Sequence, residues 1–558
     1  MRHSFILVMI GAALAAGCSK NSGSGNVTAP TPQPFRLSSV TIDGRTPSSL
    51  TYDVSVSATI RLAFTAAIDH ASAANTISLT DNTGAPVALA PSFANGDSTV
   101  VIQPSAPLKH FSAYILQAPT SLRSQGGANL SASDTLHFIT SLDSTDKFPR
   151  VSDSALLTLV QQQTFKYFWD FGHPVSGLSR ERTSSGDLVT TGGSGFGIMA
   201  ILVGIQRNFI TRSQGLGRLT TIVDFLSDST RVSRYHGAFP HWLNGSTGAT
   251  IPFSTNDDGG DIVETSYMLE GLLCARQYFN STTDAQEIAL RTAINSIWNA
   301  VDFNWYRQNG QNVLYWNWSP DHAWSVNVQV GGWCEALITY VLAASANQDS
   351  IPRIVYDNGW ARNGGMVNGK SFYGITLPLG PDQGGPLFFA HYSFLGIDPA
   401  GLSDAYANYW TQDTAHTRIN YFYCANNPKH YFGYSYLCWG LTASDEQNGY
   451  SAHSPTNDDG VISPTAAISS LPYLPTESMN TLRFFYYTLG DKLWKQYGFI
   501  DAFNLSTGWY DTDFLAIDQG PQIVMIENYR SGLLWNLFMS CPEIKAGMKK
   551  LGFQGPSL

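Results

Sequence analysis

Charged side chains are scarce in this chain. Asp, Glu, Lys and Arg together make up 13% of its 558 residues, about half of the roughly 25% found in an average soluble domain. The 32 basic residues are outnumbered by 42 acidic ones, which gives a net charge of −10. Nucleic-acid binding needs clustered Lys and Arg, so the composition excludes such a partner. Hydrophobic residues reach 43%, which excludes a disordered chain.

The motifs of several large enzyme classes are also missing. The six cysteines form no CxxC pair and no cluster with histidine, so we expect no zinc site. No GxSxG, HExxH, GxGxxG or P-loop stands at a credible position. After the first 17 residues, no apolar run reaches the ~20 residues needed to cross a bilayer. We therefore expect neither a metal nor a cofactor.

The first residues have the features of a targeting segment. Met1-Arg2-His3 is basic, and residues 4–16 are apolar but too short to span a membrane. Small residues then lead into Cys18, which resembles a bacterial lipobox, in which the cysteine is acylated. We expect a signal peptide over 1–17, a lipid anchor on Cys18 and a flexible tether over 18–34. A plain secretory signal is the alternative.

The residues after Cys18 also bear on location. Ser and Lys follow it, with no Asp at that point. By resemblance to lipoprotein sorting in Gram-negative bacteria, this favours the outer membrane. We expect a protein of the cell envelope that is anchored to the outer membrane, either in the periplasm or at the cell surface.

Residues 35–142 carry the pattern of a β-sandwich. Short β-branched segments, partly alternating in polarity, are separated by turn signals such as Asp43-Gly44 and Asn95-Gly96-Asp97. A stretch of this length suits a sandwich, and the order of its features resembles a bacterial Ig-like domain. It contains no cluster of titratable groups, so we interpret it as a spacer. Direct glycan binding is the alternative.

From about residue 150 the apolar residues follow a helical period. Long loops rich in Gly, Asn, Asp, Pro and aromatic residues join about twelve expected helices, without sustained strand alternation. This suits six helical hairpins closed into a ring, an (α/α)6 toroid over 150–558; two helical domains in series is the alternative. The fold class is therefore multidomain, an all-β sandwich followed by an all-α toroid. The expected helices lie near 154–171, 193–211, 215–229, 261–280, 284–301, 331–346, 350–362, 386–396, 401–420, 463–470, 475–494 and 520–539.

Three acidic residues gather at the start of one expected helix. Asp257, Asp261 and Glu264 are four and three residues apart, a spacing that would align them on one helical face. We favour Asp257 in the loop and Asp261 in the first turn, where its charge suits the helix dipole. The apolar residues that follow predict an inward-packed helix, and carboxylates at its buried end are costly unless they bind something. A capping role for Asp261 is the alternative, and a calcium loop is a third option, although the alternate-position acidic spacing of such a loop is missing.

Two further acids stand at helix starts. Glu335 opens an otherwise apolar helix, where burial would raise its pKa and suit it to act as a general acid; a capping role is the alternative. Asp518 is expected in a loop before a helix that contains Glu527 and Arg530. Those two could form an ion pair at i,i+3, and Asp518 could be an N-cap.

Aromatic and polar residues alternate in many of the loops. Rings stack on the apolar face of a sugar while neighbouring polar groups bind its hydroxyls, so these loops indicate a carbohydrate ligand. The predicted substrate-binding residues are Arg182, His241, Trp242, Trp318, Phe388, His391, Trp439, His453, Asn528 and Arg530.

Several stretches resemble one known family. They include NDDGGDIVETSYMLEGLL (256–273), GWCEALITYVLAAS (332–345), GYSAHSPTNDDG (449–460) and AIDQGPQIVMIENYRSGLLW (516–535). The second domain resembles the bacterial glycoamylase-like domain, and within it the endo-β-1,2-glucanases of glycoside hydrolase family 144. The resemblance implies an (α/α)6 barrel, hydrolysis of β-1,2-glucan with inversion, and a pocket containing Asp257, Asp261, Glu264 and Glu335. Cys334 stands where the family pattern leads us to expect Asn.

These inferences give a mechanistic hypothesis for a monomeric glycoside hydrolase acting on linear or cyclic β-1,2-glucan. Glu335 protonates the leaving oxygen, and either Asp518 or the Asp261/Glu264 pair activates water. In an inverting enzyme the two carboxyls stand roughly 6.5–9.5 Å apart. The alternatives are an exo-acting, sophorose-releasing enzyme, another glucan hydrolase or transglycosylase, and a surface glycan-binding lipoprotein without turnover.

Overall fold

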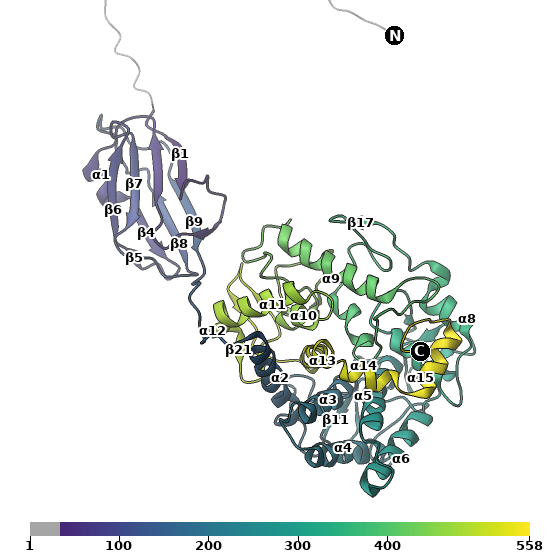
Figure 1. Ribbon diagram of the computed structural model, residues 1–558. Helices are drawn as coiled ribbons and strands as arrows, with labels where there is room; N and C mark the ends of the chain where they lie inside the picture. The colour runs from purple at the N-terminus through teal and green to yellow at the C-terminus, as the bar shows by residue number, and fades with distance from the viewer. Residues whose placement is uncertain (1–33) are drawn as a thin grey trace, which may run out of the picture. The chain divides into compact units, whose positions relative to one another are not determined.

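The computed structural model describes residues 34–558. They divide after Leu142 into two compact units, which Figure 1 shows in ribbon form. The predicted signal peptide, the predicted lipid anchor at Cys18 and all but the last residue of the predicted tether lie outside the described residues. Within 34–558, every helix is too short or too polar to be a candidate membrane span.

The first unit consists of two sheets around one apolar core. One sheet has the strand order β1-β3-β7-β6 and the other β2-β9-β8-β4-β5. Alternate residues of β3 and β9 are buried, which places Ile60, Leu62 and Phe138 in the core. The predicted β-rich domain is confirmed. Its strands are β1 Leu37–Ile42, β2 Thr51–Val54, β3 Ile60–Phe64, β4 Ser78–Asp81, β5 Pro86–Val87, β6 Leu89–Ala94, β7 Thr99–Pro104, β8 Ala113–Ala118 and β9 Asp134–Thr140, with one short helix, α1 His70–Thr76.

The second unit is helical, as predicted. Helix α3 is apolar all round and almost entirely buried, the pattern of a helix enclosed by other helices. It packs against α5 on one side and α13 on the other. The principal helices are α2 Asp153–Trp169, α3 Thr191–Gln206, α4 Arg212–Ser227, α5 Ile262–Tyr278, α6 Ala285–Asn299, α7 Leu337–Ser345, α9 Tyr409–Asn426, α10 Pro464–Ser469, α11 Pro475–Arg483, α13 Ala516–Ser531, α14 Leu533–Met539 and α15 Pro542–Leu551.

Two glycines allow α3 and α5 to pack with their backbones in contact. A Cβ on Gly195 would lie 2.1 Å from the carbonyl oxygen of Tyr267. A Cβ on Gly271 would lie 2.2 Å from the carbonyl oxygen of Gly195. No side chain can occupy either space, so glycine at these two positions sets how closely the helices approach. This contact fixes the spacing of the two helix starts, where the site described below lies.

Several predicted helices are wrong in extent or type. Residues 350–362 form mainly a π-type turn at Tyr356–Trp360, and 386–396 form two 3-10 turns. Helix α9 begins at Tyr409 rather than near 401, because Asn408 caps it by accepting a hydrogen bond from the Thr411 amide. Helix α7 begins only at Leu337, and the φ of 81° at Gly332 lies outside the helical region, which excludes a helix from 331 as predicted. Glu335 therefore stands before the helix.

Short ladders that the sequence did not predict join the helices. β13 Gly260–Asp261 pairs with β15 Asn317–Trp318, and β19 Ala443–Glu446 pairs with β20 Gly449–Ala452. Ladders of two to four residues are too short to show an alternating pattern. Helix α15 was also not predicted, although Pro542 at its start and Gly552 after its end are the usual boundary signals.

Candidate active site

A cavity of about 360 Å³ opens where several helices of the second unit begin. Its wall includes residues just before or within the first turn of α3, α7 and α13, together with the β19–β20 hairpin. The amide groups at helix starts stabilise negative charge, so acidic side chains suit this position. The residues that line the cavity are Glu181, Arg182, Thr190, His241, Trp242, Phe253, Glu335, Phe388, Tyr392, Ala443, Tyr450 and Ile517. Five of them, Arg182, His241, Trp242, Glu335 and Phe388, were predicted site residues.

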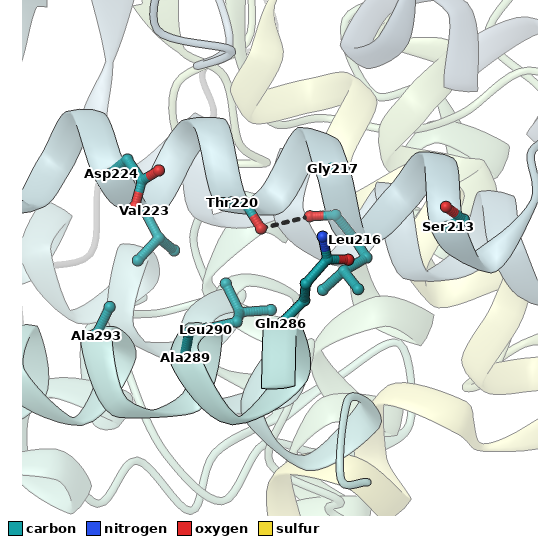
Figure 2. A pocket seen from close by; sticks show the side chains of 10 residues that line it. All are labelled: Ser213, Leu216, Gly217, Thr220, Val223, Asp224, Gln286, Ala289, Leu290 and Ala293. Atoms are coloured by element: carbon teal, nitrogen blue, oxygen red, sulfur yellow. Dashed lines mark hydrogen bonds between the residues drawn. The ribbon is translucent and has the colours of Figure 1, made fainter. Parts of the chain in front are cut away.

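A second hollow, between α4 and α6, offers no comparable chemistry (Figure 2). Its volume is about 370 Å³, and its walls are mainly small and aliphatic side chains. It contains a single carboxylate, Asp224, whereas glycoside hydrolysis needs two. The cavity at the helix starts is therefore the candidate active site.

Glu335 reaches the cavity from the turn that precedes α7. Its backbone carbonyl accepts a hydrogen bond from the Ser393 hydroxyl, which ties this turn to the neighbouring 3-10 segment. Burial raises the pKa of the Glu335 carboxyl to about 7, and the nearby negative charges of Glu264 and Asp261 add to the effect. At neutral pH this carboxyl therefore retains much of its proton, as a general acid requires.

Asp261 is the N-cap of α5. One of its oxygens accepts hydrogen bonds from the Val263 and Glu264 amides, both at 2.9 Å. The other accepts from His241 Nδ1 at 2.9 Å and from Trp316 Nε1 at 3.1 Å. The capping interpretation is thus the one the structure supports. With both oxygens engaged and the side chain fully buried, Asp261 is poorly placed to activate water.

The acids around His241 keep its ring charged. Burial by itself would lower the pKa of His241, but the charges of Glu264 and Asp261 outweigh burial and raise the pKa to about 9. His241 lines the cavity and is therefore an imidazolium at neutral pH. A positive charge at this position favours a ligand that is rich in oxygen lone pairs.

Glu264 is anchored by the start of α3. Its Oε2 accepts a hydrogen bond of 2.7 Å from the Gly192 amide. A Cβ at residue 192 would lie 2.5 Å from that oxygen, so the contact requires glycine. Burial raises the pKa of Glu264, and also that of Asp257 in the preceding loop. Loop, cap and first turn thus hold the three acids separately, not on one continuous helical face.

Asp518 lies inside α13, in its first turn, and not in the loop before the helix as predicted. It is buried beside Asp501, and burial raises its pKa to about 7. Burial also raises the pKa of Asp501. Two adjacent buried carboxyls cannot both ionise at low cost, so such a pair shares a proton near neutral pH.

A chain of contacts leads from this carboxyl pair to the cavity wall. Asp501 accepts a hydrogen bond of 2.8 Å from the Asp445 amide. Both oxygens of Asp445 accept from Arg182, at 2.8 and 2.7 Å, and Arg182 also pairs with Glu181 at 2.9 Å. Asp445 and Asp501 were missing from the predicted site. Asp445 follows the CWGLTAS stretch on a strand, but nothing in the local sequence singles out Asp501.

Aromatic rings form much of the rest of the wall. Trp242 and Phe253 lie with ring centroids 4.9 Å apart, and Phe388 and Tyr392 lie 5.1 Å apart. Tyr392 is within electrostatic range of Asp518, Glu335 and Glu264, whose charges add to the effect of burial in raising its pKa. Apolar faces beside acidic groups suit a sugar ring. Phe253 and Tyr450 were not predicted, since single aromatic residues carry no local signal.

Three predicted binding residues belong to the protein interior or to other contacts. His391 is buried, its Nε2 lies 3.0 Å from the Ser470 hydroxyl, and burial lowers its pKa to about 3. Trp439 is fully buried. Trp318 pairs with Gly260 and packs on Trp305, outside the cavity lining. The aromatic loop pattern cannot separate such residues from exposed ones.

Asn528 and Arg530 lie in the last turns of α13, remote from its start. Asn528 donates to the Leu395 carbonyl, and Arg530 donates to Thr158 and Gln161 of α2. Glu527 forms its ion pair with Arg207, at 2.6 Å, and not with Arg530 as the i,i+3 spacing suggested. These residues hold helices together. His453 is also absent from the cavity lining, being buried next to Glu446.

Comparisons with known proteins agree with this description. The Glycoamylase family, described as "Putative glucoamylase", matches residues 327–542, and the bacterial Ig-like domain matches residues 38–140. A crystallised endo-β-1,2-glucanase from Chitinophaga pinensis is 52% identical, covering 73% of this chain and 100% of that chain with a TM-score of 0.71. A β-1,2-glucanase structure from Parabacteroides distasonis is 36% identical over 93% of this chain and 73% of that one, with a TM-score of 0.70.

A curated relative from Parabacteroides distasonis has a different name. It is an exo β-1,2-glucooligosaccharide sophorohydrolase (non-reducing end), 44% identical over 423 residues. The match includes 72% of this chain but only 58% of the relative's length.

Proposed function

This chain belongs to the glycoamylase-like family, with a bacterial Ig-like domain before its helical domain, and from this premise we propose that it hydrolyses β-1,2-glucan. One observation carries the proposal: Glu335, whose pKa is raised to about 7, faces an aromatic cavity, and two residues of the cavity wall, Tyr392 and Tyr450, lie within electrostatic range of the buried Asp518. The endo-β-1,2-glucanase from Chitinophaga pinensis and the sophorohydrolase from Parabacteroides distasonis support this substrate class.

The proposed reaction is a single displacement with inversion. Glu335 donates its proton to the glycosidic oxygen as the bond from that oxygen to the anomeric carbon breaks. A water molecule attacks the same carbon from the opposite face, and its proton passes to Asp518, which shares protons with Asp501. Asp261 is assigned a positioning role, since its oxygens already serve α5, His241 and Trp316. Of the bases considered from the sequence, Asp518 is therefore preferred.

The proposal includes an (α/α)6 ring for the helical domain. Contacts between successive inner elements support it: α3 packs on α5, α5 on α7, α7 on the 3-10 segment at 392–394, and α10 on α13, which packs on α3. Hydrogen bonds link the remaining pair, from the Tyr473 hydroxyl to the Ala390 carbonyl and between His391 and Ser470. Such a ring would bring the helix starts to one mouth.

Product analysis of the purified chain tests the function. Linear β-1,2-glucan should yield soluble oligosaccharides, with the α-anomer of the new reducing end appearing first. An endo enzyme releases a range of lengths from the start, whereas an exo enzyme releases sophorose alone. Absence of new reducing ends, or first appearance of the β-anomer, would contradict hydrolysis or inversion respectively.

We also propose that the protein is anchored to the outer membrane through Cys18. The support is the sequence pattern of the first 34 residues. Growth with labelled palmitate should label the wild-type protein in the outer-membrane fraction, and the C18A variant should carry no label.

A further inference from the structure

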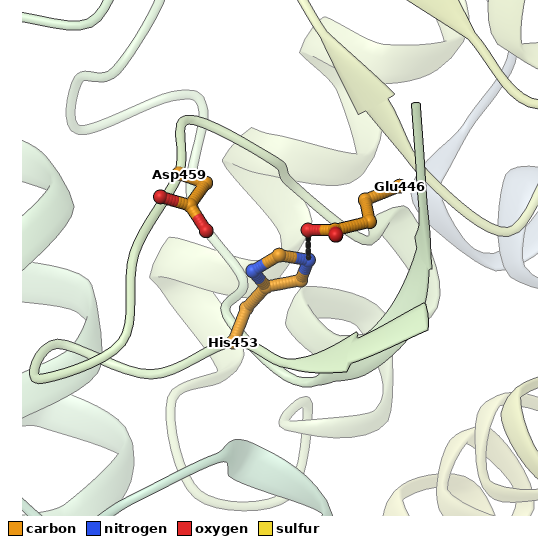
Figure 3. Close-up of side chains that lie close together, drawn as sticks. All are labelled: Glu446, His453 and Asp459. Atoms are coloured by element: carbon orange, nitrogen blue, oxygen red, sulfur yellow. Dashed lines mark ion pairs between the residues drawn. The ribbon is translucent and has the colours of Figure 1, made fainter. Parts of the chain in front are cut away.

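Three side chains capable of binding a metal converge at the β19–β20 hairpin, outside the cavity (Figure 3). Glu446 ends β19, His453 follows β20, and Asp459 lies in the next loop. One ligand atom from each residue lies within 4.8 Å of the other two. Figure 3 shows the imidazole ring between the two carboxylates. Acidic clusters are common on protein surfaces, and the buried histidine distinguishes this one.

His453 is buried, yet it lacks the hydrogen bonds of a histidine in a protein interior. Neither ring nitrogen has a hydrogen-bond partner among the described residues. Its Nε2 lies 3.7 Å from Glu446 Oε2, which is too far for a direct hydrogen bond. Leaving a buried polar group unpaired costs about 1–3 kcal/mol. A ligand from outside the protein that bonded to the ring would remove this cost.

Two other buried histidines show what is ordinary in this fold. His391 has its Nε2 3.0 Å from the Ser470 hydroxyl. His416 uses both nitrogens, one with Trp333 and one with the Gly385 carbonyl. The unpaired ring of His453 is therefore a local feature.

The backbone around the cluster is held in place by other groups. The Asp458 carboxylate accepts hydrogen bonds from the Tyr423 and Tyr434 hydroxyls, at 2.8 and 2.7 Å. Asn457 donates to the Ala452 carbonyl at 3.0 Å, and the His453 amide donates to Thr442. The backbone that carries His453 and the loop that leads to Asp459 are thus held in place without an ion, which favours binding of one.

We propose that Glu446, His453 and Asp459 bind a divalent transition-metal ion such as Zn²⁺. One imidazole nitrogen with two carboxylates suits such an ion, whereas Ca²⁺ and Mg²⁺ prefer oxygen ligands throughout. Ligand bonds of about 2.0–2.2 Å at a tetrahedral angle place two ligand atoms roughly 3.4 Å apart. The 3.7 Å between Glu446 and His453 is close to that value, and the exposed Asp459 side chain is free to turn.

The ion would act on the cavity through the hairpin. Ala443 and Tyr450 stand on β19 and β20 and line the cavity. A metal bond between the hairpin and the loop would restrict the movement of this wall. No step of the proposed hydrolysis passes through the ion, so the proposal does not depend on the proposed function.

The test is metal binding by the whole protein after treatment with a chelator and dialysis. Titration with Zn²⁺ in a calorimeter should show one equivalent bound, and Co²⁺ should give visible absorption bands of a nitrogen–oxygen site. The D459N and E446Q variants should each bind about 10-fold more weakly or worse. D459N changes an exposed side chain, so its folding is secure. The control is D224N, an exposed acid on α4.

A second readout is the melting temperature. Zn²⁺ should raise the melting temperatures of the wild type and of D224N, and it should raise the melting temperature of D459N by a smaller amount. Absence of Zn²⁺ and Co²⁺ binding to the wild type would overturn the proposal. Equal affinity of the wild type, D459N and E446Q would also overturn it, because the ion would then occupy another site.

Discussion

At the scale of single residues, the protonation of Glu335 should govern the upper limb of the pH profile. Its pKa is about 7 in the fold, against an ordinary value of 4.5. Activity should fall as pH rises through about 7, because the acid form is lost. The E335Q variant should lose about 10²–10⁴-fold in kcat, and its residual rate should lack that limb. D224N should behave as the wild type, and near-normal turnover by E335Q on linear β-1,2-glucan would refute the assignment.

The same shift predicts a pH-dependent difference in stability. The folded state binds a proton on Glu335 between pH 4.5 and about 7 that the unfolded chain has released, so the wild type loses stability as pH rises through this window. E335Q has no such group. Between pH 4.5 and about 7, the free energy of unfolding of E335Q should therefore rise by about 1–2 kcal/mol relative to that of the wild type, after allowance for the part of Glu335 that faces the cavity. Urea unfolding at pH 4.5 and pH 8 measures this difference.

A substitution at Asp261 can separate its two roles, capping α5 and placing a negative charge beside His241. Asn is a good N-cap, so D261N should keep α5 while removing the charge beside His241. The pKa of His241 should then fall from about 9 toward its ordinary value, and kcat/KM should drop by about 10–100-fold. NMR titration of the His241 ring measures the first effect. D284N is the matched control, since Asp284 caps α6 in the same manner at an exposed position; an unchanged His241 pKa in D261N would contradict the argument.

At the scale of elements, we expect opposite effects on stability from two Gly→Ala changes, one at the α3–α5 contact and one on α4. In G195A the methyl group would meet the Tyr267 carbonyl at 2.1 Å, so the helices must separate, at a cost of about 1–3 kcal/mol or more. Gly217 lies on the exposed face of α4 with nothing within 4 Å of the added carbon, so G217A should stabilise the protein by up to about 1 kcal/mol. Thermal unfolding of both variants measures this, and equal melting temperatures would contradict the crossing geometry.

Elements differ in how well the sequence predicts them. Long helices with a capping side chain at the start, such as α2, α5 and α6, were predicted to within a few residues. The prediction failed where Pro, Gly and local turns interrupt the helical period. Longer α-helices were predicted around Tyr356–Trp360 and Leu387–Ala390, which form only short π-type and 3-10 turns. In the site, acids at helix starts could be recognised, because charge before an apolar helix is unusual. Asp501 could not, because only the tertiary fold brings it beside Asp518.

At the scale of the whole molecule, the cavity is built from the second unit alone. Its lining residues lie between positions 181 and 517, while the first unit ends at Leu142. A chain comprising 143–558 should therefore hydrolyse soluble oligosaccharides with kcat/KM within about twofold of the full chain, since each compact unit has its own core. Initial rates on both proteins measure this, and a large loss would show that residues 34–142 contribute to catalysis.

Because Asp261 both starts α5 and, together with Glu264, keeps His241 charged, the charge of the site depends on the order of a helix end. Helix ends fray before helix centres on warming. Fraying here would lower the pKa of the imidazole while the rest of the domain still holds its shape. Turnover should thus vanish several degrees before ellipticity does, and cooling from that interval should restore it.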